Sequence, residues 1–257
     1  MSPGRSLDGR HALITGGGSG IGAAIAHSLA AAGARVSLIG RRAAPLEEVA
    51  GQLADAIAIS ADVSSPESVT AAFGAARAAF GPLSILVNNA GIAPSAPFAK
   101  TSTDQWDEVL RINLSGAFYC AREAVGDLLQ AGGGRLINIA STAGLKGYGY
   151  VAHYCAAKHG LIGLTRALAA EYALKDITVN AVCPGYTDTG IVARTVDNIV
   201  DKTGRSADQA IADLVRGNPQ GRLIDPPEVA STVLWLCGAE ARSITGQAIA
   251  VAGGEVT

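Results

Sequence analysis

Near the N-terminus, an apolar run at 11–15 is followed by Thr15-Gly16-Gly17-Gly18-Ser19-Gly20-Ile21-Gly22, and a helical pattern covers 21–32. Glycines between a strand and a helix let the backbone approach a pyrophosphate, while the helix N-terminus supplies amide donors and a positive dipole end. The spacing is T-G-x-x-x-G-x-G rather than the commoner G-x-G-x-x-G. A structural turn is the alternative, and the position after the first strand favours a dinucleotide-binding loop.

The alternation of strand and helix continues along the whole chain. Further strands are expected at 35–39, 56–60, 83–87, 135–140, 177–182 and 247–251. Further helices are expected at 46–53, from Ser65-Pro66-Glu67, from Ser102 to about 129, at 152–173, and from 226 to about 238. This order predicts an α/β Rossmann domain with a doubly wound, mostly parallel seven-stranded sheet and helices on both faces.

No linker or repeat interrupts the pattern, so we expect one domain over 1–257, with 1–100 mainly binding a dinucleotide and 101–257 carrying catalysis and substrate binding. The segment 186–223 departs from the alternation because it is long and polar, and its part 187–216 is the candidate lid. It contains Thr203-Gly204-Arg205-Ser206, a turn with little to bury. Such excursions are usually functional, so we expect a mobile lid there.

The composition narrows the class of protein. The chain has 257 residues, of which 49% are hydrophobic and 16% are charged. Its net charge is -2 and no run of Lys or Arg forms a basic stripe, so no nucleic-acid partner is expected. No apolar run reaches membrane-spanning length, and residues 1–10 contain no signal-peptide core. The cysteines are Cys120, Cys155, Cys183 and Cys237, which form no C-x-x-C. We therefore expect a cytoplasmic protein with reduced thiols, no metal site and no membrane partner.

A proton-transfer pair is indicated in the helix at 152–173. Tyr154 and Lys158 are four positions apart and therefore lie on one helix face. A phenol titrates near pH 10, and an ammonium group beside it favours the phenolate. We therefore expect Lys158 to lower the pKa of Tyr154 and make it a general acid and base.

Further landmarks occur in a characteristic order. Asp62-Val63 follows the third strand, Asn88-Asn89-Ala90-Gly91 ends the fourth, and Asn113 lies on the next helix. Ser141 ends the fifth strand thirteen positions before Tyr154, and Pro184-Gly185 ends the sixth, before Thr187 and Thr189. Together with the glycine loop and the Tyr-Lys pair, this set resembles the short-chain dehydrogenase/reductase family over essentially the whole chain.

The resemblance implies a role for each landmark. Tyr154 would exchange a proton with the substrate oxygen, Ser141 would donate a hydrogen bond to that oxygen, and Lys158 would hold the nicotinamide ribose. Asn113 would kink its helix and position a water that links Lys158 to solvent. The cofactor-binding set is Gly16, Ser19, Gly20, Ile21, Gly22, Arg41, Arg42, Asp62, Val63, Asn89, Ala90, Gly91, Tyr154, Lys158, Pro184, Gly185, Thr187 and Thr189.

The cofactor's ribose end is expected after the second strand. The strand ends in Gly40 and is followed by Arg41-Arg42, with no carboxylate to bond a ribose 2′-hydroxyl. Two guanidiniums could instead bind a 2′-phosphate, so we expect NADP, with NAD possible. Solvated surface charges are the alternative. Asp62 is expected at the adenine amino group or, alternatively, as a helix cap before Pro66.

The substrate is less well specified. Leu145, Tyr148, Tyr150, Ile191, Val192 and residues 93–98 are candidate pocket walls, a mainly apolar set that suits a medium-sized carbonyl compound. The stretch 152–185 resembles aromatic polyketide ketoreductases and 3-oxoacyl-thioester reductases, which implies ketone reduction. Oxidation of an aryl, cyclic or steroid alcohol is the alternative, and a non-catalytic nucleotide sensor a distant one.

Three further expectations concern the two long helices expected from Ser102 and Ala152. His153 is expected at the pocket mouth and His159 against a neighbouring element, neither of them catalytic. Apolar residues on the helices from Ser102 and Ala152, which relatives pair between subunits, indicate a homotetramer, with 251–257 at a second interface and a dimer as the second choice.

Overall fold

The protein was examined as a computed structural model, which describes residues 6–256. Its strands are β1 His11–Thr15, β2 Arg35–Gly40, β3 Ala56–Ser60, β4 Ile85–Asn88, β5 Arg135–Ile139, β6 Thr178–Pro184 and β7 Ala248–Val251. Its α-helices are α1 Gly20–Ala31, α2 Ala43–Ala50, α3 Pro66–Phe80, α4 Thr103–Leu110, α5 Gly116–Gln130, α6 Ala152–Tyr172, α7 Gly190–Thr203, α8 Ala207–Val215 and α9 Pro226–Cys237.

The seven strands form one sheet in the order β3-β2-β1-β4-β5-β6-β7, and every pairing is parallel. The doubly wound sheet expected from the sequence is therefore confirmed. The strand order reverses between β1 and β4, and α/β sheets bind ligands at such a reversal, outside the carboxyl ends of the strands.

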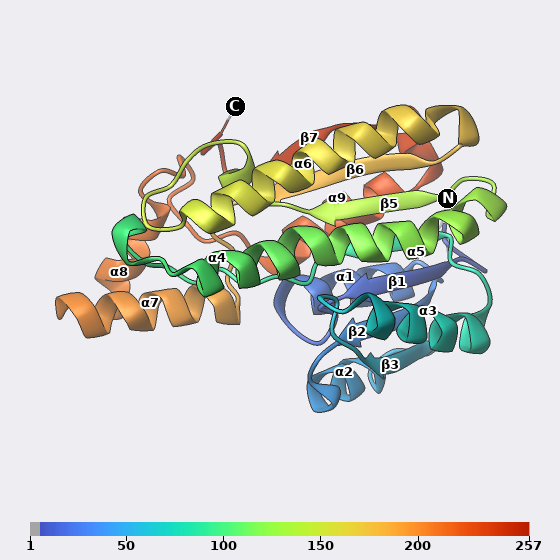
Figure 1. Ribbon diagram of the computed structural model, residues 1–257, viewed down its shortest axis with the longest axis horizontal. Coiled ribbons are helices and arrows are strands. Elements are labelled where there is room, and N and C mark those ends of the chain that lie inside the picture. The colour runs from blue at the N-terminus through green and yellow to red at the C-terminus, as the bar shows by residue number, and fades with distance from the viewer. Residues whose placement is uncertain (1–5, 257) are drawn as a thin grey trace.

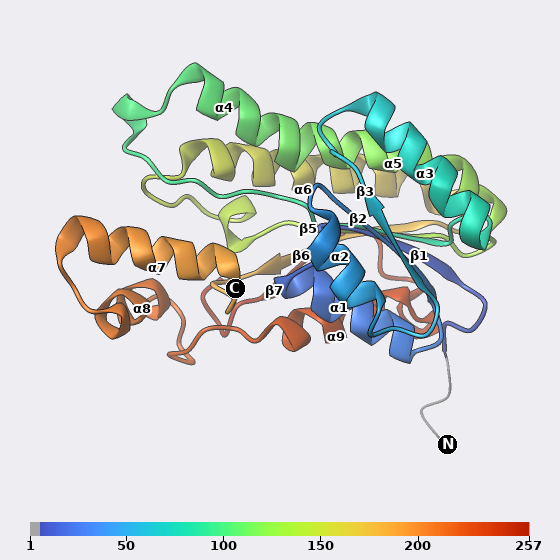
Figure 2. The same cartoon turned by 90° about the horizontal axis from the view of Figure 1, so that it is seen from below.

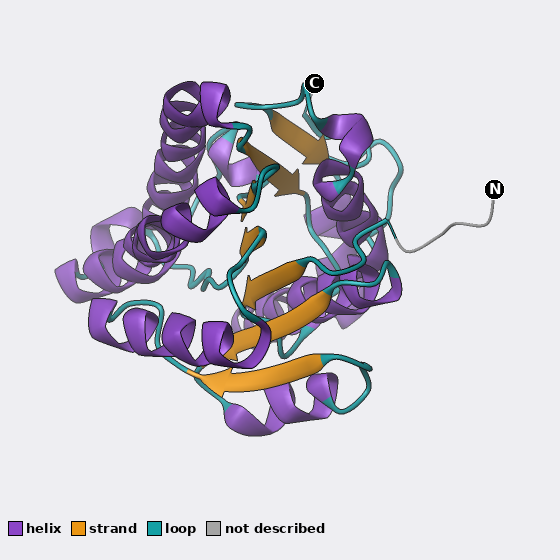
Figure 3. Cartoon of the chain, turned by 90° about the vertical axis from the view of Figure 1, so that its right-hand side faces the viewer, coloured by secondary structure: helices purple, strands orange, loops and turns teal. Residues whose placement is uncertain are grey.

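Helices cover both faces of the sheet (Figures 1–3). Successive side chains of a strand point to opposite faces, and Leu13 therefore packs with Phe73 of α3, while its neighbour Ile14 packs with Ile25 of α1. The core on one side joins α3 and α5, and the core on the other joins α1, α2 and α9. Burial on both faces explains the nearly continuous apolar runs of the central strands.

Capping residues in the sequence predict the start of some helices and not of others. Ser65 caps α3 by accepting a hydrogen bond from the Ser68 amide, 3.2 Å away, with Pro66 in the first turn. The helix expected at 46–53 instead begins at Ala43, so that Pro45 lies in its first turn. Proline is tolerated there because the amide it lacks would have no helical partner. The cap of this helix, Arg42, is extended.

In the second half of the chain, one expected distortion is present and one segment differs from expectation. The helix expected from Ser102 to about 129 is interrupted by a π-helical turn, Arg111–Ser115, between α4 and α5. The polar segment 187–216 is largely helical and forms α7 and α8, which lie beyond the carboxyl ends of the strands at the left of Figure 1.

Within residues 6–256, no helix is both long and apolar enough to cross a membrane. Residues 1–5, part of the segment expected to lack a signal peptide, and residue 257 lie outside the described part of the chain.

Candidate active site

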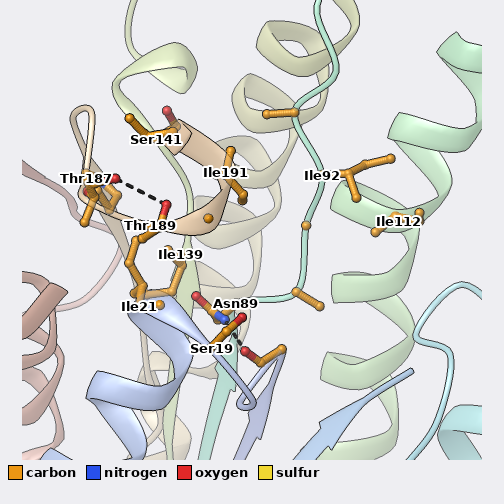
Figure 4. A pocket seen from close by; sticks show the side chains of 18 of the residues that line it. Ser19, Ile21, Asn89, Ile92, Ile112, Ile139, Ser141, Thr187, Thr189 and Ile191 are labelled. Carbon is orange, nitrogen blue, oxygen red and sulfur yellow. Dashed lines mark hydrogen bonds between the residues drawn. The ribbon is translucent and has the colours of Figure 1, made fainter. Parts of the chain in front are cut away.

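A cavity of about 860 Å³ lies at the carboxyl ends of the strands (Figure 4). It joins the glycine loop, the end of β2, the β4 and β5 ends, the start of α6 and the start of α7. Every residue of the predicted cofactor set lines it except Gly22. Of the predicted catalytic set, Ser141, Tyr154 and Lys158 line it and Asn113 does not.

The glycine loop is shaped to receive an anion. Gly20 has a φ of +53°, which a residue with a side chain rarely adopts, and it begins α1. Ser19, the helix cap, makes no side-chain capping bond, so the first amides of α1 are left for a ligand. Gly22 lies behind the loop, where a Cβ atom would be 2.2 Å from the Gly16 carbonyl oxygen. Gly22 is therefore needed for close packing behind the loop and does not line the cavity.

Hydrogen bonds between neighbouring strand ends fix this loop. The Asn89 side-chain amide donates to the carbonyl oxygens of Thr15 and Gly16, at 3.0 and 3.1 Å. The Thr15 hydroxyl accepts from the backbone amides of Asn89 and Ala90, at 2.9 and 3.0 Å. Asn89 thus lines the cavity and also holds the loop that would carry a pyrophosphate.

The three polar residues at the centre of the cavity come from two adjacent elements. Ser141 follows β5, and α6 presents Tyr154 and Lys158 one turn apart. The Lys158 ammonium is buried, donates to the Ile139 carbonyl oxygen at 2.7 Å, and lies 5.6 Å from the centre of the Tyr154 ring. A hydroxyl, a phenol and an ammonium group therefore line the same part of the cavity, with the ammonium group the most buried of the three.

The pKa of Tyr154 differs in direction from the expectation. Burial raises it to about 12, and the neighbouring Ser141 hydroxyl only partly offsets this. Burial also lowers the pKa of Lys158, to about 8. The net direction for the pKa of Tyr154 is therefore opposite to the expected one, because desolvation disfavours the charged form of both groups and outweighs the favourable neighbours.

Asn113 lies just behind the cavity. It is buried in the π-helical turn, where its side chain accepts from the Ile92 amide at 2.8 Å and donates to the Ile92 carbonyl at 2.7 Å. The Asn113 oxygen and the Lys158 nitrogen both approach Gly91. The expected helix distortion is confirmed, and the proposed water relay stays a prediction.

The ribose end of the cavity carries the two arginines. Arg41 and Arg42 are exposed and line the cavity after β2. Asp62 also lines it, and its carboxylate accepts from the amide and hydroxyl of Ser64, at 2.9 and 2.8 Å. Burial raises the pKa of Asp62, but these bonds outweigh it and the net direction is downward. Asp62 is thus not the helix cap, a position that Ser65 occupies.

The substrate side of the cavity was only partly predicted. Tyr148, Ile191 and Val192 line it, whereas Leu145, Tyr150 and Phe98 are exposed and do not. His153 is fully buried with neither ring nitrogen paired, and His159 is exposed, so both differ from their expected surroundings.

Several lining residues lie outside the predicted sets because no motif marks them: Gly18, Pro45, Leu46, Ile112, Thr142, Val151, Tyr186 and Arg194 are among them. Arg194 lies within the predicted lid and Tyr186 directly precedes it. Ser95 belongs to the predicted wall 93–98 and does line the cavity. Thr187 and Thr189 were predicted, and their hydroxyls donate to the carbonyls of Gly185 and Thr187, at 3.0 and 3.2 Å.

Comparison with known proteins agrees with this geometry. The profile of the short chain dehydrogenase family matches residues 10–199. The chain belongs to this family. This short-chain dehydrogenase superimposes with a TM-score of 0.92 on a crystal structure of a single-residue variant of actinorhodin polyketide ketoreductase with NADPH. The two are 36% identical, and the match covers 96% of this chain and 97% of the other.

Characterised relatives of this short-chain dehydrogenase differ in the reaction for which they are named. An acetoacetyl-CoA reductase from Shinella zoogloeoides is 40% identical, over 96% of this chain and 98% of its own. A cis-4-hydroxycyclohexanecarboxylate dehydrogenase from Sinomonas cyclohexanicum is also 40% identical, over 98% of each chain. Both names describe interconversion of a carbonyl and a secondary alcohol.

Proposed function

We propose that this protein is an NADP(H)-dependent oxidoreductase that reduces a medium-sized ketone to a secondary alcohol. The observation that carries the proposal is the convergence of Ser141, Tyr154 and Lys158 in the same cavity as the glycine loop. The reductase relatives support the reaction class. The direct test is loss of NADPH absorbance with a panel of 3-oxoacyl thioesters and cyclic ketones.

The residues suit an acid that serves reduction. A nicotinamide bound along the cavity supplies the hydride. The Tyr154 phenol, which is protonated at neutral pH, is the proton donor to the carbonyl oxygen. Ser141 donates a hydrogen bond to the same oxygen, which stabilises its developing negative charge. Lys158 holds the ribose hydroxyls and its charge stabilises the phenolate left behind.

The cofactor's adenosine end is assigned to the two arginines. The first amides of α1 would bind the pyrophosphate, and Arg41 and Arg42 would bind a 2′-phosphate. No carboxylate follows β2 within 40–42 to repel that phosphate. NADP therefore fits this donor set better than NAD.

Arg41→Asp should weaken NADPH much more than NADH, by about tenfold or more for the lost charge-assisted contact. The change removes a donor and adds a repelling charge. Fluorescence titration with each cofactor measures the two dissociation constants. Equal weakening of both, or a wild-type preference for NADH, would contradict the assignment. Arg122→Asp, on α5 outside the cavity, is the matched control.

Oxidation of a secondary alcohol is the second candidate function, because the cyclohexanecarboxylate relative is named as a dehydrogenase. The same residues would then act in reverse, with Tyr154 as the base. Assays in both directions with one ketone–alcohol pair, at equal saturation, separate the candidates. The mainly apolar wall around Tyr148 and Ile191 suits either a ketone or a secondary alcohol. Neither candidate function requires a carrier protein to present the substrate.

We also propose a homotetramer, because partly exposed aromatic side chains lie on the helices that were expected to pair. Trp106 of α4 and Phe118 of α5 are 37% and 42% exposed. Light scattering should give a tetramer at micromolar concentration, and a monomer alone would contradict this. The second interface expected at 251–257 includes residue 257, outside the described residues.

All four cysteines are free, which supports a cytoplasmic location.

The segment 187–216, with α7 and α8, is proposed to act as a lid within the catalytic part of the domain. Its amphipathic helices flank the cavity, and Ile191, Val192 and Arg194 line it. Amide hydrogen exchange in this segment should slow at saturating NADP⁺, because the lid closes over the cofactor. Equal exchange with and without NADP⁺ would exclude this role.

A further inference from the structure

The loop 142–151 connects two residues of the proposed active site. Ser141 precedes it directly, and α6 with Tyr154 begins directly after it. Tyr150 in this loop has a φ of 68°, a strained conformation for a residue with a side chain, which persists only where surrounding contacts enforce it. One such contact is the 2.9 Å hydrogen bond from the Ala96 amide to the Tyr150 carbonyl.

A second set of contacts comes from the C-terminal tail, which lies beside this loop in Figure 1. The hydroxyl of Tyr148 donates to a carboxylate oxygen of Glu255 at 2.5 Å. The Thr142 hydroxyl lies 2.7 Å from the Tyr148 hydroxyl and can donate to it. The Lys146 ammonium lies 3.2 Å from the same Glu255 oxygen. Three side chains of the loop are therefore gathered, directly or through Tyr148, on one carboxylate.

The burial of this group makes the contacts strong. The Glu255 side chain is 4% exposed, and a buried carboxylate is costly unless charge and hydrogen-bond partners compensate it. Burial, and then the bond to Glu255, raise the pKa of Tyr148, so its hydroxyl remains a donor. Losing either partner would leave the other buried polar group unsatisfied.

The same carboxylate approaches the base of the lid. A Cβ atom on Gly185, at the end of β6, would be 3.2 Å from one Glu255 oxygen. A Cβ atom on Gly217, just after α8, would be 3.5 Å from the other. Tyr148 itself lines the cavity and packs edge-to-face with Tyr186 at 6.3 Å between ring centres. The group therefore connects the loop, the lid base and the substrate wall.

We propose that Glu255 is a positioning residue that clamps the loop 142–151 and holds Tyr148 as a fixed wall of the substrate pocket, which sets the size of ketone that the enzyme accepts. This inference rests on the proposed ketone reduction for its effect on substrate choice. The clamp itself is a property of the fold and has a readout that requires no turnover.

Hydrogen exchange of the loop 142–151 tests the clamp. Glu255→Ala should speed exchange there by about tenfold or more, the effect of one lost hydrogen bond to a charged group. Glu255→Gln keeps an acceptor and should restore part of the protection. Glu171→Ala, at an exposed glutamate of α6, is the control and should leave the loop unchanged. Unchanged loop exchange in Glu255→Ala would overturn the proposal, whatever the enzyme's activity.

Kinetics test the effect on substrate choice. The ratio of kcat/KM for a bicyclic ketone to that for a small acyclic ketone should change by about tenfold in Glu255→Ala. Tyr148→Phe should change it in the same direction, and the double variant should add little, because the two residues act as one unit. Equal loss for both ketones would overturn the specificity role. A wild-type enzyme that reduces no ketone would instead refute the proposed function, and the exchange experiment would still decide the clamp.

Discussion

Tyr154→Phe should lose nearly all turnover, by at least about 100-fold, while the affinity for NADPH stays within a few-fold. The change deletes only the hydroxyl that is proposed to exchange a proton with the substrate oxygen. The ring, which lies beside the Lys158 ammonium, is kept. Steady-state rates with a ketone substrate and a fluorescence titration of NADPH make the two measurements.

Retention of more than about a tenth of wild-type kcat, a barrier change under roughly 1.4 kcal/mol, would remove Tyr154 from the role of proton donor. Tyr186→Phe is the matched control. That phenol lines the same cavity but follows β6 and does not belong to the α6 pair. Its loss should change rates far less than the loss of the Tyr154 hydroxyl.

The parts of the site that the sequence predicts are those determined by local spacing. The glycine loop, Ser141 at the end of β5 and the Tyr154–Lys158 pair all follow from strand–turn–helix order and helical periodicity. The parallel order of the strands then brings their carboxyl ends to one edge. Local sequence and strand order therefore suffice to place these residues in one cavity.

The remaining features depend on contacts between distant residues. The bond from Tyr148 to Glu255 joins positions 107 apart, and no motif indicates it. The pKa direction of Tyr154 follows from its burial, which the spacing of a Tyr-Lys pair does not reveal.

The helices α7 and α8 were missed although the sequence carries signals for both. Val192, Val196 and Ile199 recur at helical spacing, and Ser206 with Gln209 forms a capping box.

Lys158→Met should abolish activity and yet make the protein more stable at pH 7. The pKa of Lys158 falls from 10.5 to about 8 in the folded state, because burial disfavours the ammonium. At 1.36 kcal/mol per pKa unit, burying the charge destabilises the fold by roughly 3 kcal/mol. The lost hydrogen bond from the charged Lys158 to the Ile139 carbonyl would offset roughly 2 kcal/mol of the gain. A higher Tm by a few °C is therefore expected.

The pH dependence gives the sharper test of this effect. Below about pH 8 both the folded and the unfolded wild type carry the Lys158 proton, so the full cost is present. Between about 8 and 10.5 the unfolded chain binds more protons than the folded one, so wild-type stability rises relative to the variant as pH increases. Urea unfolding of both proteins at pH 7 and pH 10 should therefore show the variant's advantage shrinking.

Lys175→Met, at an exposed lysine, controls for a general effect of replacing a charge and should show no such pH dependence. A Lys158→Met protein that is less stable than wild type at pH 7, or an advantage that is unchanged at pH 10, would contradict a buried ammonium group. Because the proposed proton transfer needs that charge beside the Tyr154 ring, the protein would keep Lys158 at a cost in stability. The combination of lost turnover and gained stability would thus distinguish a catalytic lysine from a structural one.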